Sequence, residues 1–144
     1  MGGDTMKKTV YQPQETPYSL HDMNIIEFEI TDHDSLIIRT QSGMVQTTPP
    51  YAQPNGYIEF EQVQWDYSYV YIMHHFGNVG TFTGEKKHLY ELINSFHNCG
   101  ISVMDETFGF NQTKFAGYLK GNHTFSECIL EIYHEGNRIY YTEE

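Results

Sequence analysis

The sequence contains few of the features that mark secreted, membrane-spanning or disulfide-rich proteins. Its two cysteines, Cys99 and Cys128, are far apart and form no CxxC pattern, so we expect two buried, reduced thiols. No apolar run approaches the ~20 residues that a membrane helix needs. The lysines near the N-terminus are not followed by the apolar stretch of a secretory signal. These observations predict a soluble cytoplasmic protein.

Basic residues are scarce. Eight Lys and Arg residues face nineteen Asp and Glu residues, which gives a formal net charge of −11. Proteins that bind nucleic acids need Lys and Arg to displace counterions from phosphates, and anionic membranes attract the same residues. The charge therefore argues against nucleic acid and membrane as partners. A basic protein partner is electrostatically permitted.

Aromatic residues are abundant, with 12 Tyr and 9 Phe beside a single Trp. Tyr and Phe favour pleated, half-buried surfaces, so this composition favours β-sheet. A chain of 144 residues fits one domain with its own core. Residues 1–18 are polar and contain two prolines, which predicts a poorly ordered N-terminal arm. Residues 19–144 are predicted to form a single β-rich domain.

Apolar and polar residues alternate with a period of two through most of the chain. The strands that this pattern predicts most clearly span residues 24–30, 57–63, 65–76, 124–133 and 138–142. The period changes once, within residues 85–98, where apolar residues recur at i, i+3, i+4 and i+7. These residues are Leu89, Leu92, Ile93 and Phe96. The sequence therefore predicts an α+β fold of about eight or nine mainly antiparallel strands in a curled sheet or partial barrel, covered on one face by an amphipathic helix near 85–98.

One predicted strand carries a row of aromatic residues on a single face. The row consists of Trp65, Tyr67, Tyr69 and Tyr71. At ~3.4 Å per residue it forms a platform about 20 Å long. Aromatic residues with polar tips are enriched at protein interfaces and stack on sugars, so these four are the candidate binding residues. The interpretation that we favour for the row itself is packing beneath the predicted helix, whose apolar face needs a partner.

Catalytic and metal-binding motifs are missing from the sequence. His74 and His75 are adjacent and point to opposite faces of a strand, and neither HxH nor HExxH occurs. No GxSxG is present, and we expect the carboxylate pairs, Asp105 with Glu106 and Glu59 with Glu61, at wet strand edges. We therefore predict no cofactor, no metal and no catalytic residue. The remaining histidines that an alternative metal site would use are His33, His123 and His134.

Three segments resemble a group of small bacterial domains of uncharacterised function. They are LHDMNI at 20–25, DETFGFNQ at 105–112 and FAGYL at 115–119. The resemblance spans residues 20–142 and implies no activity. Some compact acidic domains of similar shape act as immunity-type inhibitors of toxins, which is an analogy of shape alone.

The sequence alone does not reveal what the domain does. The leading hypothesis is a non-enzymatic protein-binding or assembly domain that uses an aromatic or edge-strand surface. Its partner can be a second copy of the same chain, which would make it a homodimer. Three alternatives stay open. They are a small metal- or ligand-dependent enzyme, a carbohydrate-binding module that uses the tyrosine row, and an immunity-type inhibitor of a basic toxin.

Overall fold

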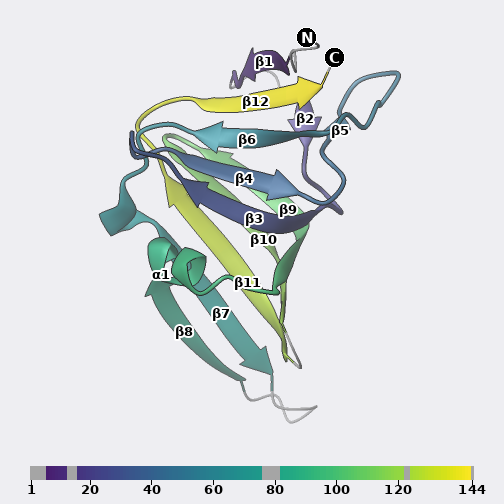
Figure 1. Cartoon of the computed structure of the whole chain (residues 1–144). Coiled ribbons are helices and arrows are strands. Elements are labelled where there is room, and N and C mark those ends of the chain that lie inside the picture. Colours follow the sequence, from purple (N-terminus) through teal and green to yellow (C-terminus); the bar gives the residue numbers. More distant parts are fainter. Residues whose placement is uncertain (1–5, 13–15, 76–81, 122–123, 144) are drawn as a thin grey trace.

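The computed structural model describes residues 6–12, 16–75, 82–121 and 124–143. These residues form a mostly antiparallel sheet that curls on itself without closing into a barrel, together with one short helix (Figure 1). The β-rich α+β fold predicted from the sequence is thereby confirmed. In this part of the chain, no helix combines the length and the hydrophobicity needed to span a bilayer.

The main sheet has ten strands. In chain order they are β1 (Met6–Val10), β3 (Asn24–Ile30), β4 (Leu36–Thr40), β6 (Gly56–Phe60), β7 (Tyr69–His75), β8 (Phe82–His88), β9 (Gly100–Gly109), β10 (Gln112–Gly121), β11 (Thr124–Tyr133) and β12 (Arg138–Glu143). Their spatial order is β1-β12-β6-β4-β3-β9-β10-β11-β7-β8, and β2 (Tyr18–Ser19) pairs separately with β5 (Val45–Gln46). The described residues thus form more strands than the eight or nine expected.

Part of the predicted N-terminal arm belongs to the sheet. Strand β1 pairs with β12 in a continuous antiparallel register, from Met6 opposite Glu143 to Val10 opposite Ile139. Backbone hydrogen bonds hold this segment in place, although its side chains are only partly buried. The prediction of little structure over residues 1–18 is therefore wrong for this strand.

The helix is much shorter than the segment 85–98 that the periodicity predicts. Helix α1 spans Leu89–Asn94, and the preceding residues form β8, which pairs with β7. The polar residues 85–88 supply no apolar helical face, and pairing with β7 satisfies their backbone groups instead. The apolar stripe nevertheless packs as predicted, because Leu89 and Leu92 are buried and Phe96 packs against the core.

The core lies between the two halves of the curled sheet. Strands β6 and β10 are not neighbours in the sheet, yet the rings of Phe60 and Phe115 approach to 6.2 Å between centroids. Helix α1 closes this core against β7 and β11 (Figure 1). Other fully buried members from the two halves are Ile38, Ile58, Ile101, Val103, Leu130 and Ile132.

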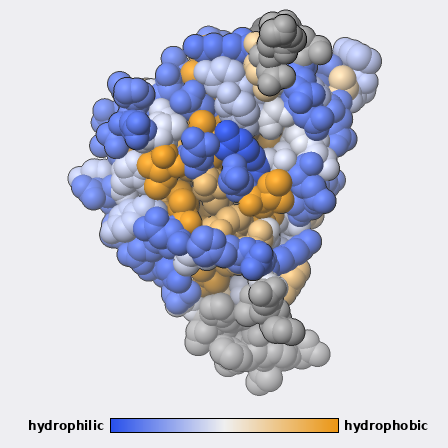
Figure 2. Space-filling model, in the orientation of Figure 1, coloured by the Kyte–Doolittle hydropathy of each residue, from blue (hydrophilic) through white to orange (hydrophobic). Residues whose placement is uncertain are grey.

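One face of the molecule gathers hydrophobic surface at mid-height, with polar surface around it (Figure 2). On β3, Ile26 and Ile30 are 50% and 41% exposed. The same strand carries Glu27 and Glu29, which lie 2.8 and 2.7 Å from the guanidinium of Arg39 on β4. Ion pairs thus interrupt the apolar residues of this strand.

Candidate functional site

The predicted aromatic row is divided between two elements. Trp65 and Tyr67 lie in a turn of 3-10 helix, η1 (Trp65–Tyr67), whereas Tyr69 and Tyr71 lie on β7. The prediction of one continuous strand over 65–76 is therefore wrong in its first part, and the four residues do not form a single platform.

Ser68 accounts for the break between η1 and β7. Its side chain is fully buried, and its hydroxyl donates to the Gln64 carbonyl at 2.9 Å. The same hydroxyl accepts a hydrogen bond from the backbone N–H of Tyr133 at 3.0 Å. These bonds hold a turn where the alternation of side chains suggested an extended strand, and they tie η1 to the end of β11.

The tyrosines of β7 do not pack beneath the helix. Val70 and Ile72 form the buried face of this strand and share the core with Leu89 of α1. Successive side chains of a strand point to opposite faces, so Tyr69 and Tyr71 lie on the outer face. Packing of the row beneath the helix, the interpretation favoured from the sequence, is therefore wrong.

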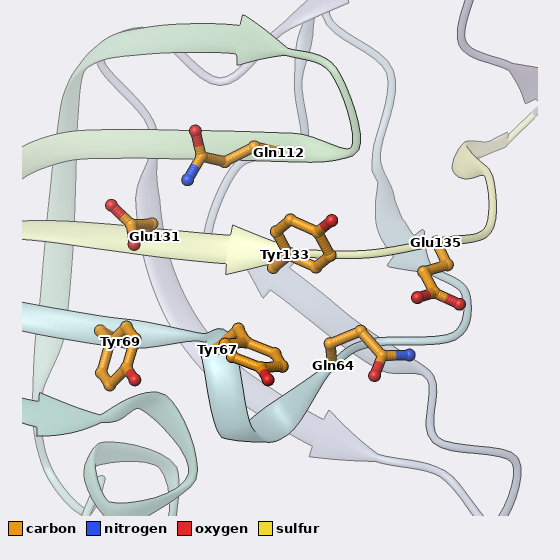
Figure 3. A pocket seen from close by; sticks show the side chains of 7 residues that line it. All are labelled: Gln64, Tyr67, Tyr69, Gln112, Glu131, Tyr133 and Glu135. Carbon is orange, nitrogen blue, oxygen red and sulfur yellow. The ribbon is translucent and has the colours of Figure 1, made fainter.

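Tyr67 and Tyr69 line an open pocket of about 380 Å³, which we call the tyrosine pocket (Figure 3). Its lining consists of Gln64, Tyr67, Tyr69, Gln112, Glu131, Tyr133 and Glu135. The rings of Tyr67 and Tyr133 lie beside each other, 6.2 Å apart between centroids and tilted by 58°. Ligand pockets commonly span about 300–1,000 Å³, so this one suits a single side chain or a sugar unit rather than a large cofactor.

Sheet register brings the lining residues together from distant parts of the sequence. Gln112 on β10 lies opposite Tyr133 on β11, and Glu131 on β11 lies opposite Tyr69 on β7. The intervening residues of β11 are buried, which directs Glu131 and Tyr133 outward. Glu135 lies in the turn between β11 and β12. Figure 3 shows Glu135 with Gln64 at one end of the pocket and Glu131 with Gln112 toward the other.

The lining residues are acidic or neutral, and the cations lie at the margin. The ammonium of Lys114 is 3.7 Å from Glu131, which partly compensates that carboxylate. No described residue forms an ion pair with Glu135. The ammonium of Lys86 lies 4.0 Å from the centroid of the Tyr69 ring. The Tyr69 hydroxyl donates to a backbone carbonyl at 3.0 Å, so that ring is held in place.

The other two predicted binding residues lie outside the pocket lining. Trp65 is partly buried and packs against the core. Tyr71 lines an adjacent groove of about 350 Å³ with Met73 and Ile129. The structure therefore brings Tyr67 and Tyr69 together with Tyr133, a residue that the sequence did not single out.

Metal-binding side chains do not cluster in the part of the chain that the structure describes. Within it, no group of three or more His, Cys, Asp or Glu residues could hold a metal ion. The side chains of His74 and His75, and the whole of His123, lie outside the described residues. His33 lines a second, more polar pocket of about 480 Å³, which shares Glu135 with the tyrosine pocket, and His134 is buried.

Among the candidate acid–base and nucleophilic groups are a buried carboxylate, a hydrogen-bonded carboxylate and a thiol that stays protonated. Glu106 turns into the core, whereas its neighbour Asp105 is exposed. Glu59 accepts a hydrogen bond from the Tyr141 hydroxyl at 3.2 Å. Partial burial and, to a smaller extent, the charge of this carboxylate raise the pKa of Tyr141 to about 12. Burial raises the pKa of the Cys128 thiol to about 12, so that group stays protonated near neutral pH.

No protein-family model, curated protein or solved structure matches this chain. Aromatic faces, amide groups and two carboxylates line the tyrosine pocket, and its lining includes no Ser, Thr, Cys, His or Lys. This arrangement suits binding by stacking and hydrogen bonding.

Proposed function

We propose that this domain is a non-enzymatic protein-binding module whose partner docks on the outer face of β10, β11 and β7, around the tyrosine pocket. The observation that carries the proposal is an aromatic pocket with solvent-accessible walls on a sheet face that the core does not use. Tyrosine is enriched at protein interfaces and among the few residues that contribute most of the binding energy there. An accessible pocket lined by tyrosines is therefore typical of a protein-binding surface.

Two aromatic side chains in this region are strongly exposed. Tyr67 is 63% exposed, and Phe110 is 91% exposed in the turn between β9 and β10, two residues before Gln112 of the pocket. Burial of a phenylalanine side chain contributes roughly 1.5–3 kcal/mol. A partner that covers Phe110 gains this energy in addition to contacts within the pocket.

The edge strands favour the pocket over edge-to-edge pairing as the interaction surface. Strand β1 carries Lys7 and Lys8, and β8 at the other edge carries Glu85, Lys86 and Lys87. Charged residues, lysine above all, are a common means of preventing unwanted strand addition. We therefore place the partner on the sheet face.

Site-specific photo-crosslinking tests the proposal in cells that make the protein. The photoreactive residue benzoylphenylalanine is placed at position 67 or 110 of the full chain and, as a control, at position 51. Tyr51 is 62% exposed, close to the 63% of Tyr67, but it lies in the segment between β5 and β6 and does not line the tyrosine pocket. We expect the same discrete protein adduct from positions 67 and 110 and none from position 51. Absence of an adduct at 67, or identical adducts from 51, contradicts the proposal.

A carbohydrate ligand is the second candidate, because Tyr67 and Tyr69 stay accessible beside the amides of Gln64 and Gln112. Aromatic rings stack on sugar faces while amide and carboxylate groups bind hydroxyls. The sole tryptophan, Trp65, adjoins the pocket and serves as a fluorescence reporter. Titration with glucose, galactose and N-acetylglucosamine oligomers gives a saturable change if this candidate is correct. A flat response to all of them removes it.

A further inference from the structure

The lining of the tyrosine pocket has the composition of a site for a cationic group. All of its charged members, Glu131 and Glu135, are carboxylates, and three tyrosine rings supply electron-rich faces. Cations are attracted to the faces of aromatic rings within about 6 Å, and more strongly when the site excludes water. The whole chain carries a formal charge of −11, which draws a basic partner toward it from a distance.

The molecule already places its own cations on aromatic rings. The Lys86 ammonium lies 4.0 Å from the Tyr69 centroid and 5.6 Å from that of Tyr71. In the core, the guanidinium of Arg138 lies 4.3 Å from the centroid of Phe108. Tyr67 and Tyr133 form the corresponding aromatic wall on the open side of the pocket, and no described residue places a cation on either ring.

The uncompensated negative charge lies at one end of the pocket. Lys114 is paired with Glu131 at 3.7 Å, so this carboxylate is partly neutralised. Glu135 is exposed and has no ion-pair partner in the described part of the chain. A cation that lies against Tyr67 and Tyr133 from the open side of the pocket therefore has Glu135 as its charge partner, since Figure 3 shows Glu135 on the same side of these two rings as Gln64.

A guanidinium fits these groups better than an ammonium. It is planar and weakly hydrated, so it can stack on a tyrosine ring while its edges donate hydrogen bonds in a fixed fork. The side-chain oxygens of Gln64 and Glu135 lie at one end of the pocket and are suited to accept them. An ammonium is a compact, strongly hydrated charge that makes less use of a flat aromatic wall.

On these grounds we propose that the tyrosine pocket binds an arginine side chain of a basic protein partner, held against Tyr67 and Tyr133 and paired with Glu135. This inference rests on the proposed function, because it names the group that the partner inserts. The exposed Phe110 then contacts the partner beside the inserted arginine.

The test is a titration of the isotopically labelled full chain, followed by NMR, with three short acetylated and amidated peptides. Their central residues are arginine, lysine and citrulline, the last being a neutral isostere of arginine. We expect saturable shifts of the Gln64 and Gln112 side-chain amides with the arginine peptide. We also expect weaker binding of the lysine peptide and no saturable binding of the citrulline peptide.

Three variants locate the bound arginine. Tyr67→Ala and Glu135→Gln are each expected to raise the Kd of the arginine peptide about fivefold. The matched control Tyr51→Ala removes an equally exposed tyrosine elsewhere and leaves the Kd unchanged. The proposal is overturned if citrulline or lysine binds as tightly as arginine, or if Tyr51→Ala weakens binding as much as Tyr67→Ala.

The two proposals can fail separately. If the peptides show no preference for arginine but the adducts from positions 67 and 110 persist, the arginine assignment is wrong and the protein-binding surface stands. If those adducts are missing while the arginine peptide binds, the pocket accepts a guanidinium but the proposed protein-binding function is wrong.

Discussion

The Glu106 carboxylate lies 3.4 Å from the guanidinium of Arg138 inside the core, where the two side chains are 9% and 1% exposed. The carboxylate also accepts hydrogen bonds from the hydroxyl of Ser19 at 2.8 Å and the backbone N–H of Leu20 at 3.0 Å. Five aromatic rings surround the guanidinium with centroids 4.3–5.8 Å away. The pair thus joins β9, β12 and the segment around β2 across the interior of the curled sheet.

Removal of one partner of this pair is expected to destabilise the fold strongly. Glu106→Gln leaves the buried guanidinium without its countercharge, which typically costs about 3–5 kcal/mol. Urea denaturation followed by the fluorescence of Trp65 measures the loss. The double variant Glu106→Leu with Arg138→Met removes both charges, and we expect it to be more stable than Glu106→Gln.

The exposed ion pair between Glu29 and Arg39 provides the control. Glu29→Gln removes a carboxylate 2.7 Å from a guanidinium, in the same kind of pair but in contact with solvent. Exposed pairs contribute about 0–1 kcal/mol, so we expect the unfolding free energy of this variant to stay close to that of the wild type. Equal losses for Glu29→Gln and Glu106→Gln would mean that burial does not set the contribution of the core pair.

Gly117 is a position where even one methyl group is expected to disrupt the sheet. A Cβ there would lie 1.7 Å from the backbone oxygen of Ser102, next to the register shift between β9 and β10. Gly117→Ala forces the two strands apart, and we expect a loss of about 2–3 kcal/mol in unfolding free energy. A Cβ at Gly100 would lie 3.7 Å from its nearest atom, so Gly100→Ala should lose far less unfolding free energy in the same denaturation experiment.

Period-two alternation locates strands in the sequence even where the structure leaves both faces partly exposed, as on β3. The prediction of strands over 24–30 and 124–133 coincides with β3 and β11. Alternation fails where hydrogen bonds override it, as at Ser68, whose buried hydroxyl holds η1 in a turn. The predicted helix, residues 85–98, is longer than α1, because the apolar stripe marks the residues that contact the core and not the residues at which the helix begins and ends.

The candidate site was only half predictable, for a topological reason. Tyr67 and Tyr69 stand out in the sequence as aromatic residues close together. Glu131 and Tyr133 gain their importance only because β11 lies beside β7, although the two strands are distant in the chain. Strand order depends on long-range packing, and residue periodicity carries no information about it.

His134 is expected to make the stability depend on pH. Its Nδ1 lies 3.1 Å from the carbonyl oxygen of Gly136 and therefore donates, while Nε2 accepts from the Thr113 hydroxyl at 3.0 Å. The neutral ring satisfies both bonds. Burial, and to a smaller extent the charge of Arg138, lowers the pKa of His134 from its ordinary 6.5, although the bond to Gly136 acts in the opposite direction.

The unfolded chain therefore binds a proton at position 134 more readily than the folded chain. The stabilising effect of the neutral ring is fully present above about pH 6.5 and decreases as the pH falls below that value. We expect the urea midpoint to fall between pH 7.5 and 5.5, and to fall less in His134→Gln than in the wild type. His33→Gln, at an exposed position, is the control. The assignment is contradicted if the urea midpoint of His134→Gln falls between pH 7.5 and 5.5 as much as that of the wild type.

The two thiols are expected to differ sharply in reactivity. Both are free, but Cys128 is 1% exposed on β11 whereas Cys99 is only partly buried after α1, contrary to the expectation of two buried thiols. The thiolate is the reactive form, and burial raises the pKa of Cys128 to about 12. Titration of the folded protein with Ellman's reagent at pH 8 should modify Cys99 rapidly and Cys128 only after unfolding in urea. Cys99→Ser should abolish the rapid phase, and a rapid phase that persists in this variant would show that the β11 strand opens readily.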